Sequence, residues 1–539
     1  RLGTKRASVL LVGDPGVGKT TVLAEVARRM EREARRKKRR CPYRLWTTNA
    51  HRVIAGMRFL GQWQERCEKL IEELSSVDGM LCVENLLDLV RTGGEGPADS
   101  VAAFLAPYMR RGELRIVGES TPSELDACRR LLPGFADLFQ VLNVPAFGDK
   151  DAKVVLGQMA DQVSQNAHVS VQEGVPDMVH RLFGRFVPYA AFPGQAVDFL
   201  IRSVDSVREE KGKELTKGAV LDAFAKRTGL PEIFLRDELT ISQEQVFDRF
   251  RSQIIGQERA CHIASGLVTR FKAGMNDPMR PIGVLIFCGP TGVGKTALAR
   301  QLSEYFFGRG DESDRLIRLD MSEYGSPSGA QRLVAAPDGG PSDLIKRMRR
   351  QPFSLVLLDE VEKAHPQVFD VLMNVFDEGR LSDPYGRMTT FRSAIIIMTS
   401  NLGASQQGAL GFGEQPPVYE EEVMKFFRPE FFNRIDAVVT FDPLEHDSVL
   451  KIAEKELAEI PQREGLKAYG IRLSWSRLVL EHLAKMGFDI RYGARPLQRT
   501  IEKSVVTPLA RFLAEKPKLR NVEIHLDMDD NGQVAVTRR

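Results

Sequence analysis

Two copies of one loop motif constrain this chain more than any other feature of its sequence. The pattern GxxxxGK[ST] occurs at residues 13–20 and again at residues 289–296. Each copy follows a short apolar run, at 9–12 and at 284–288, and precedes a stretch with helical periodicity. In a strand–loop–helix unit of this kind, backbone N–H groups close around phosphate, the lysine reaches the outer phosphates and the hydroxyl faces Mg²⁺. The sequence therefore predicts two nucleotide sites.

The residues of the two loops are the expected contacts to ATP and Mg²⁺. In the first loop they are Gly13, Asp14, Pro15, Gly16, Val17, Gly18, Lys19, Thr20 and Thr21. In the second loop they are Gly289, Pro290, Thr291, Gly292, Val293, Gly294, Lys295, Thr296 and Ala297. Thr20 and Thr296 carry the hydroxyl groups that we expect to contact the metal.

Length and composition indicate several packed domains. The chain has 539 residues, which is enough for roughly three or four domains of ~150 residues. It is 43% hydrophobic and 27% charged, as is typical of packed globular domains, and no apolar run approaches the ~20 residues that span a bilayer. The six cysteines form no CxxC pair, so we expect a reducing, cytoplasmic location. Because the chain begins at Arg1, we interpret it as a fragment lacking N-terminal residues.

The charge balance does not favour nucleic acid or a membrane as a partner. The net charge is only +4, and the one dense basic run is at residues 35–40. We interpret that run as a solvated loop, and contact with an acidic partner or nucleic acid is the alternative. A nucleic-acid motor is therefore the third function class, after the two considered below.

The order of segments predicts two α/β modules, each followed by a small lid. We expect α/β domains with parallel sheets at 1–145 and 245–445, helical lids at 146–210 and 446–539, and a polar linker at 211–244. The expected strands are 9–12, 80–83, 114–118, 284–288, 316–320, 355–358 and 394–399, with a β tail at 522–527 and 534–536.

Polar residues at strand ends carry the predicted chemistry of the second module. The apolar run 354–358 ends in Asp359 and Glu360, and the run 394–400 ends in Asn401. Parallel strands deliver their carboxyl ends to the ligand edge of a sheet. Asp359 can hold Mg²⁺ through water, Glu360 can act as general base, and Asn401 can orient the attacking water. A surface acidic pair is the alternative for the two carboxylates.

Two arginines are candidates to neutralise charge on the transferred phosphate. Arg434 lies in FFNRID and Arg495 in YGARPL. Arginines in these positions can stabilise the transition state of phosphoryl transfer. From spacing alone, a surface ion pair is the favoured interpretation of each arginine.

Longer stretches of residues 245–527 are similar to a known family. They occur in the order IIGQ at 254–257, GPTGVGKTALAR, LLDEVEKAHPQVFDVLMNVFDEGRLSD, IIIMTSNLGAS, FRPEFFNRID and YGARPLQRTIEK. This order resembles the second ATPase module of the Clp-type AAA+ unfoldases ClpA, ClpB and ClpC. The resemblance implies an ATPase that remodels or unfolds protein substrates as a homo-oligomeric, hexameric ring.

The same resemblance assigns roles to individual residues. It implies that Asn401 is sensor 1, that Arg434 is an arginine finger acting on the neighbouring subunit, and that Arg495 is sensor 2. It also implies that Ile254 and Ile255 line the adenine pocket.

Residues 9–200 resemble the first ATPase module of the family more distantly, and the catalytic positions are eroded. The Asp-Glu strand end reads Glu84-Asn85, and although Glu84 could still help with Mg²⁺, an amide at 85 cannot accept a proton. The arginine pair of the family is missing from Ala136-Asp137-Leu138-Phe139, and its Pro-Asp-Lys reads Pro193-Gly194-Gln195. We expect this module to bind nucleotide structurally and to hydrolyse it very slowly or not at all.

The substrate-gripping loops of the family are only partly present. Phe59, in Arg58-Phe59-Leu60-Gly61, takes the place of an aromatic pore residue, with a core phenylalanine as the alternative. In the second module the aromatic loop is deleted from Val334–Gly340. The sequence also lacks the coiled-coil middle domain of the family.

Two further expectations remain open. Leu410-Gly411-Phe412 resembles the tripeptide with which ClpA and ClpC dock onto a protease chamber, although a loop-packing role is the simpler interpretation. The alternative to a remodelling ATPase is an ATP-controlled assembly switch for an N-terminal effector domain, without polypeptide threading.

Overall fold

The structure is a computed structural model, and the chain divides into two compact units. It describes residues 7–38, 44–55, 62–94, 96–187, 191–308, 315–384, 386–403, 419–489, 493–517 and 519–538. One unit is built mainly from residues 1–224 and the other from most of residues 225–539. Phe59 and Leu410-Gly411-Phe412 lie outside the described residues.

The first unit contains a five-stranded, all-parallel sheet. Its strand order is β2 (Arg44–Thr48), β3 (Gly79–Val83), β4 (Ile116–Ser120), β1 (Ser8–Val12) and β5 (Phe139–Asn143). The strands β1, β3 and β4 are buried at every position, as expected of strands covered on both faces.

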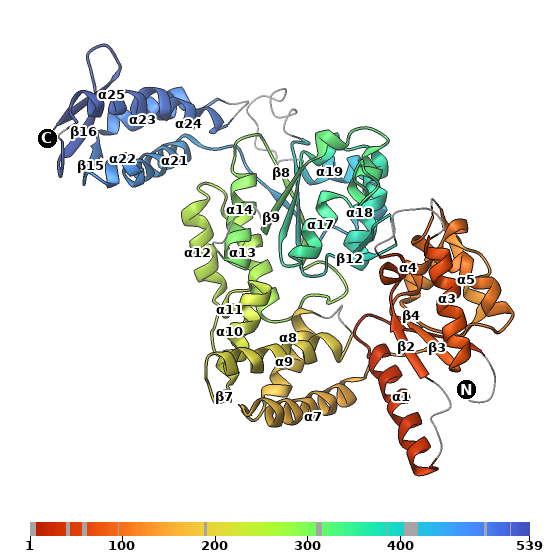
Figure 1. The fold of residues 1–539 in the computed structure, drawn as a ribbon. Helices are drawn as coiled ribbons and strands as arrows, with labels where there is room; N and C mark the ends of the chain where they lie inside the picture. Colours follow the sequence, from red (N-terminus) through yellow and green to blue (C-terminus); the bar gives the residue numbers. More distant parts are fainter. Residues whose placement is uncertain are drawn as a thin grey trace. The chain divides into compact units, whose positions relative to one another are not determined.

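Helices cover both faces of this first sheet. They are α1 (Lys19–Arg36), α2 (Ala50–Ile54), α3 (Gln62–Ser76), α4 (Leu86–Arg91), α5 (Val101–Arg110) and α6 (Pro122–Leu131). Leu10, Leu81 and Ile116 face a core shared with α2 to α6, whereas Met80 and Val117 on the other face pack with Leu23 of α1. Figure 1 shows α1 on one side of the sheet and α3 and α5 on the other.

A helical lid completes the first unit. It contains α7 (Asp149–Ala167), α8 (Val175–Phe186), α9 (Gly194–Glu209), the short parallel pair β6 (Ser170–Val171) and β7 (Glu214–Leu215), and the start of α10 (Lys217–Thr228). Phe183, Phe199 and Phe224 meet with ring centroids 5.6–5.8 Å apart. The chain from 211 to 224, expected to be linker, thus packs as part of this lid, and the predicted domain boundaries remain predictions.

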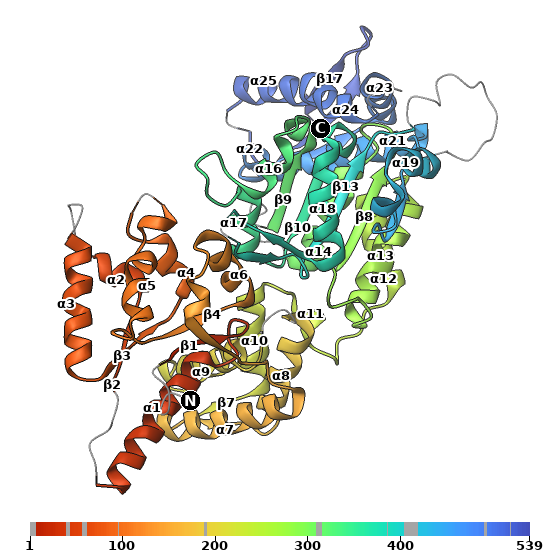
Figure 2. The ribbon, with the colours of Figure 1, turned by 90° about the vertical axis from the view of Figure 1, so that its right-hand side faces the viewer.

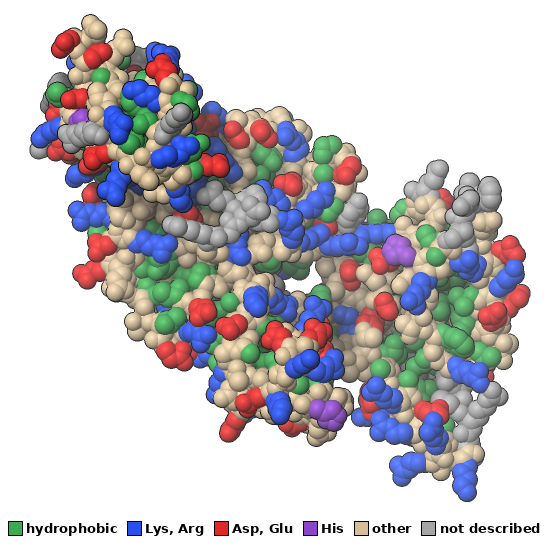
Figure 3. Space-filling view, turned by 60° about the vertical axis from the view of Figure 1, so that its left-hand side comes forward, with side chains coloured by type: hydrophobic (Ala, Val, Ile, Leu, Met, Phe, Trp, Pro, Cys, Tyr) green, Lys and Arg blue, Asp and Glu red, His purple; other side chains and the backbone are tan. Residues whose placement is uncertain are grey.

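Some of the basic residues of α1 pair with carboxylates of the same helix. Glu25 contacts Arg29 and Arg32, and Glu31 contacts Arg35, all as exposed ion pairs. Figure 3 shows Lys and Arg side chains with carboxylates among them at the lowest part of the view, where this helix ends. This pattern is that of a solvated helix face with i,i+4 pairs. Arg39 and Arg40 lie outside the described residues.

The second unit repeats the sheet with the same connectivity. Its order is β14 (Ala437–Thr440), β8 (Gly283–Cys288), β13 (Ile395–Ser400), β10 (Leu355–Asp359) and β9 (Leu316–Asp320), again all parallel. Figure 2 shows β9, β10, β13 and β8 side by side in this order. In both units the P-loop strand lies between the last strand and the fourth strand of its sheet.

Helices also cover this second sheet. They are α11 (Glu232–Leu235), α12 (Gln243–Gln253), α13 (Glu258–Lys272), α14 (Lys295–Phe307), α16 (Gly329–Val334), α17 (Asp343–Arg350), α18 (Pro366–Glu378), α19 (Tyr419–Phe426) and α20 (Pro429–Phe432). Val284, Val356 and Ile396 face a core shared with α16 to α20. Figure 1 shows α13 and α14 on one side of the sheet and α17 and α18 on the other.

The second lid has its own core. It comprises α21 (His446–Glu459), α22 (Glu464–Lys467), α23 (Arg477–Gly487), α24 (Arg495–Ile501), α25 (Thr507–Glu515) and the strands β15 (Arg472–Trp475), β16 (Glu523–Met528) and β17 (Val534–Arg538). The last two strands pair antiparallel, which confirms the predicted β tail.

The predicted α/β class is confirmed, and the expected strands exist with ends shifted by up to two residues. Within the two five-stranded sheets, β2, β5 and β14 were not predicted from the sequence. β2 has only exposed and half-buried positions, and β5 is exposed at three of its five. Among the described residues, no helix is both long and apolar enough to cross a membrane.

The aromatic cluster of the first lid yields a stability prediction. Phe224→Ala should destabilise the lid by ~3–5 kcal/mol, because the fully buried ring contacts α8 and α9. Hydrogen exchange of the α8 and α9 amides measures this local loss. Phe147→Ala is the matched control, since that side chain is 41% exposed, and its amide protection should be unchanged. Unaltered protection in Phe224→Ala would contradict the assignment of 211–224 to the lid.

Candidate nucleotide-binding sites

The second P-loop is held by its own lysine. Lys295 is the first residue of α14, and its ammonium group donates to Gly289 O, to Pro290 O at 3.0 Å and to Asn401 Oδ1 at 2.8 Å. The residue is only 8% exposed, and burial lowers the pKa of this lysine to about 8. Gly292 and Gly294 have positive φ, which aims their backbone N–H groups into the loop's concavity.

Asp359 is positioned at the end of β10 by two neighbouring strands. Its Oδ1 accepts from the Thr399 hydroxyl of β13, and its Oδ2 accepts from the Arg318 guanidinium of β9, with Nε at 3.1 Å. The carboxylate is thereby oriented before any cation binds, because both of its oxygens are engaged. An oxygen donor of this kind beside a threonine hydroxyl suits Mg²⁺.

Glu360 adopts an unusual backbone conformation. Its φ of 56° and ψ of 52° lie in the left-handed region, which costs a non-glycine residue of order 1–3 kcal/mol. The Thr399 hydroxyl accepts from the Glu360 N–H at 3.0 Å, and Lys363 contacts the Glu360 carboxylate. Thr399 therefore holds both acidic residues in place, and the left-handed conformation turns the chain at Glu360 out of the direction of β10.

Asn401 is placed by contacts on both its ends. The backbone N–H donates to Glu362 Oε1 at 3.1 Å, and the side-chain oxygen accepts from Lys295. The amide therefore lies beside the lysine that is predicted to contact the outer phosphates, a position compatible with the predicted role in orienting water.

These residues share one pocket of about 410 Å³ in the second unit, a size suited to a nucleotide. Its polar lining includes Lys295, Thr296, Asp359, Glu360, Thr399 and Asn401. Its apolar lining includes Ile254, Ile255, Leu444, Ile452 and Leu497, together with the polar Gln253, Lys455, Glu456 and Gln498. The donor set fits Mg²⁺ and phosphate, and the apolar residues suit a planar base. Val293 and Ala297 of the predicted set also line the pocket.

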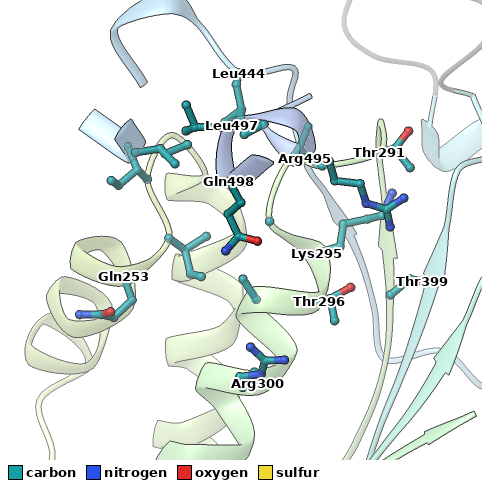
Figure 4. Close-up of a pocket in the computed structure, with 18 of the residues that line it drawn as sticks. Gln253, Thr291, Lys295, Thr296, Arg300, Thr399, Leu444, Arg495, Leu497 and Gln498 are labelled. Atoms are coloured by element: carbon teal, nitrogen blue, oxygen red, sulfur yellow. The ribbon is translucent and has the colours of Figure 1, made fainter. Parts of the chain in front are cut away.

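The lid contributes one wall of this pocket. The Ala494 N–H donates to Gly292 O at 3.2 Å, and Gly493 lies so close that a Cβ there would be 2.5 Å from Thr291 O. Arg495, the next residue, lines the pocket, and Figure 4 shows its side chain beside that of Lys295. The structure thus brings this predicted arginine to the site.

Arg434 lies elsewhere. Its Nε forms an ion pair with Asp377 Oδ1 of α18 at 2.8 Å, and it is absent from the described residues that line the pocket. The ion pair is the simple alternative that spacing left open. A role toward a neighbouring subunit remains a prediction.

The first P-loop has the same backbone contacts. Lys19 Nζ donates to Gly13 O at 2.8 Å and to Asp14 O at 3.0 Å, the positions equivalent to Gly289 and Pro290. Burial lowers the pKa of Lys19. The lid contact also recurs, since the Gly194 N–H donates to Gly16 O at 2.9 Å. In this lid Gln195 takes the place of Arg495.

The acidic strand end of the first module is different. Glu84 is exposed, and Asn85 caps helix α4, its Oδ1 accepting from Leu87 N–H at 2.9 Å while its amide donates to Glu124. Instead, Thr20 Oγ1 donates to Glu119 Oε2 at 2.9 Å. Burial raises the pKa of Glu119, which is 6% exposed.

Comparisons with known proteins agree with this geometry. Residues 280–438 match the family model described as AAA domain (Cdc48 subfamily), and residues 444–526 match the C-terminal, D2-small domain of ClpB protein. The chaperone protein ClpB of Oceanobacillus iheyensis is 31% identical over 610 aligned positions, covering 98% of this chain and 74% of the relative. The chain belongs to the Clp family of AAA+ ATPases.

Other members of the family give the same result. ClpC/MecB of Bacillus subtilis, named a negative regulator of genetic competence, is 31% identical over 98% of this chain and 74% of its own. The S. cerevisiae Hsp104–ADP complex superposes with a TM-score of 0.76 at 25% identity, covering 99% of this chain and 93% of that one. The predicted family is confirmed, and this Clp-family chain is a protein-remodelling ATPase of the AAA+ class.

Three residues that organise the sites were not predicted from the sequence. Thr399 and Arg318 orient Asp359 in the second module, and Glu119 contacts Thr20 in the first. A polar side chain at the end of an apolar strand was the available signal for Thr399 and Glu119. Nothing local marked Arg318, which acts from the neighbouring strand.

The lowered pKa of Lys295 predicts a pH effect on nucleotide binding. Bound phosphate favours the charged ammonium, so ADP binding to the second site should take up a proton above pH about 8. The dissociation constant should then rise by up to about tenfold per pH unit. Calorimetry of ADP binding in buffers of different ionisation enthalpy, on a chain carrying Lys19→Ala, measures this uptake. Lys295→Arg is the control, because arginine stays charged and uptake should vanish. Uptake that persists in this variant would contradict the assignment.

The lid contact predicts a steric effect on catalysis. Gly493→Ala should lower ATP turnover by about tenfold or more, because a Cβ would push the lid and Arg495 from the P-loop. Gly532→Ala is a matched control, since it has φ of 70° against 58° for Gly493 but open space around its Cβ. Equal turnover in the two variants would show that the contact does not matter for catalysis.

Proposed function

We propose that the second module hydrolyses ATP and that the first binds nucleotide as a structural element of the assembly. The observation that carries the proposal is the contrast between the strand ends: Asp359 and Glu360 line the second pocket, whereas Asn85 caps a helix in the first module. An amide that caps a helix cannot take a proton from water.

Within one subunit, the second module supplies most of the groups that phosphoryl transfer requires. Lys295 would bind the outer phosphates, Thr296 and Asp359 would hold Mg²⁺, which would offset the charge of the phosphates, and Glu360 would accept a proton from water that Asn401 orients. Arg495 neutralises charge from the lid. Release of Glu360 from Lys363 makes the carboxylate available as a base.

We further propose that the chain works as a hexameric ring on protein substrates. Arg434 is absent from the described lining of the pocket in its own subunit, which is what a finger acting on a neighbour requires. An Hsp104 complex with FITC casein, 27% identical to this chain, supports a polypeptide substrate. A proteolytic chamber as partner remains a weaker proposal, because it depends only on Leu410-Gly411-Phe412.

Paired variants test the division of labour. Glu360→Gln should lower ATP turnover by ~10²–10⁴-fold with assembly retained, because only the base is removed. Lys19→Ala should chiefly weaken assembly in ATP. Steady-state turnover and oligomeric mass, measured on the same samples, check both. ATP turnover that survives in Lys295→Ala would contradict the proposal, since hydrolysis would then occur in the first module.

An ATP-controlled assembly switch is the second candidate function, favoured by the absence of an aromatic residue from Val334–Gly340. Phe59→Ala separates the two candidates, because Phe59 is the remaining candidate grip. In a threading motor this variant should keep ATP turnover and lose unfolding of a fluorescent substrate protein. Unchanged unfolding activity would argue against threading through this residue, and an absence of unfolding in the parent would favour the switch.

A further inference from the structure

Glu119 occupies a position that is unusual for its chemistry. On strand β4 it pairs with Leu11 of β1, two residues before Gly13 opens the first P-loop. In the second module Thr399 of β13 pairs with Phe287 of β8, two residues before Gly289. The two residues therefore occupy the same place in equivalent sheets, where one module has a hydroxyl and the other a carboxylate.

The neighbouring strand confirms this register. Val83 of β3 pairs with Gly118, and Leu358 of β10 pairs with Met398. Glu84 and Glu119 are thus the next residues along adjacent strands, as Asp359 and Thr399 are in the second module. In the second module the carboxylate at this edge is Asp359 of β10, and the Thr399 hydroxyl donates to it directly.

In the first module the carboxylate nearest the P-loop hydroxyl comes from β4 instead. Glu119 Oε2 lies 2.9 Å from Thr20 Oγ1, and the residue is 94% buried, whereas Glu84 is exposed. A buried carboxylate is costly unless it is paired or binds a cation. Thr20 is the hydroxyl that a P-loop presents to Mg²⁺, so Glu119 is within reach of that ion or its bound water.

We propose that Glu119 is the carboxylate that holds Mg²⁺ with nucleotide in the first module, acting with Thr20, and that it replaces the strand-end aspartate of the second module. The proposed carboxylate ligand comes from the strand next to the one that supplies Asp359 in the second module, whereas the P-loop threonine is at the same position in both. This inference rests on the proposed binding of nucleotide by the first module. It makes the first site a Mg²⁺–nucleotide site without a general base, which suits retention of nucleotide without turnover.

Nucleotide affinity with and without the metal tests the proposal independently of activity. The full chain carrying Lys295→Ala leaves only the first site able to bind a fluorescent ADP analogue. Its affinity is measured in Mg²⁺ and in EDTA, and the ratio of the two affinities is the readout. Bound Mn²⁺, followed by electron paramagnetic resonance in place of Mg²⁺, reports the metal directly.

Two isosteric variants on adjacent strands make a matched pair. Glu119→Gln should reduce the affinity ratio by ~10-fold or more and weaken Mn²⁺ binding to the same extent. Its affinity in EDTA should be equal to or tighter than that of its parent, which also shows that the site is folded. Glu84→Gln should leave the ratio within about twofold of the parent, because that carboxylate is exposed. Glu119→Thr, which introduces the residue of the second module, should behave like Glu119→Gln.

Other results overturn the proposal. A ratio unchanged in Glu119→Gln would mean that Glu119 only accepts a hydrogen bond from Thr20, since the amide oxygen preserves that contact. A ratio lost in Glu84→Gln alone would assign the metal to β3. If the chain carrying Lys295→Ala binds no analogue under either condition, nucleotide binding by the first module fails, and this inference fails with it.

Discussion

One buried ammonium group organises the second site. Lys295 is almost fully enclosed, and its hydrogen bonds to two loop carbonyls and to Asn401 hold the P-loop, the start of α14 and the end of β13 in one arrangement. A charge in this position is costly without an anion, as its lowered pKa indicates. Nucleotide binding is therefore favoured by the buried lysine, because a bound phosphate offsets the cost of keeping that lysine charged.

Both modules build this arrangement on the same backbone framework. The sheet order, the lysine contacts to the loop carbonyls and the hydrogen bond from the lid to Gly16 or Gly292 recur in each unit. The differences lie in the side chains that this framework presents, at 84–85, 119 and 195. The two modules therefore share the framework of the P-loop and lid, and they differ at the positions that we propose act on water.

The sequence predicted those parts that depend on short segments. A P-loop, an apolar strand and an acidic strand end are each complete within about ten residues, so Lys295, Asp359 and Glu360 could be assigned from the sequence alone. Ile254, Ile255 and Arg495 required the family resemblance, and the pocket contains all three. Contacts across strands could not be predicted, because Arg318 and Asp359 are 41 residues apart and Thr20 and Glu119 are 99 apart.

The backbone conformation at the strand end differs between the two modules, since the left-handed conformation of Glu360 is not repeated in the first module. Asn85, at the equivalent strand end, has φ of −140° and is in ordinary extended backbone, and its side chain caps α4. Unlike Glu360, Asn85 therefore carries no backbone strain, and it supplies a helix cap worth about 1 kcal/mol. Under the proposed division of labour, the residue that replaces the general base also stabilises the fold of the first module. A glutamate placed at position 85 would meet extended backbone instead of the left-handed turn of Glu360, so reproducing the second module's acidic pair there requires a conformational change as well as a new side chain.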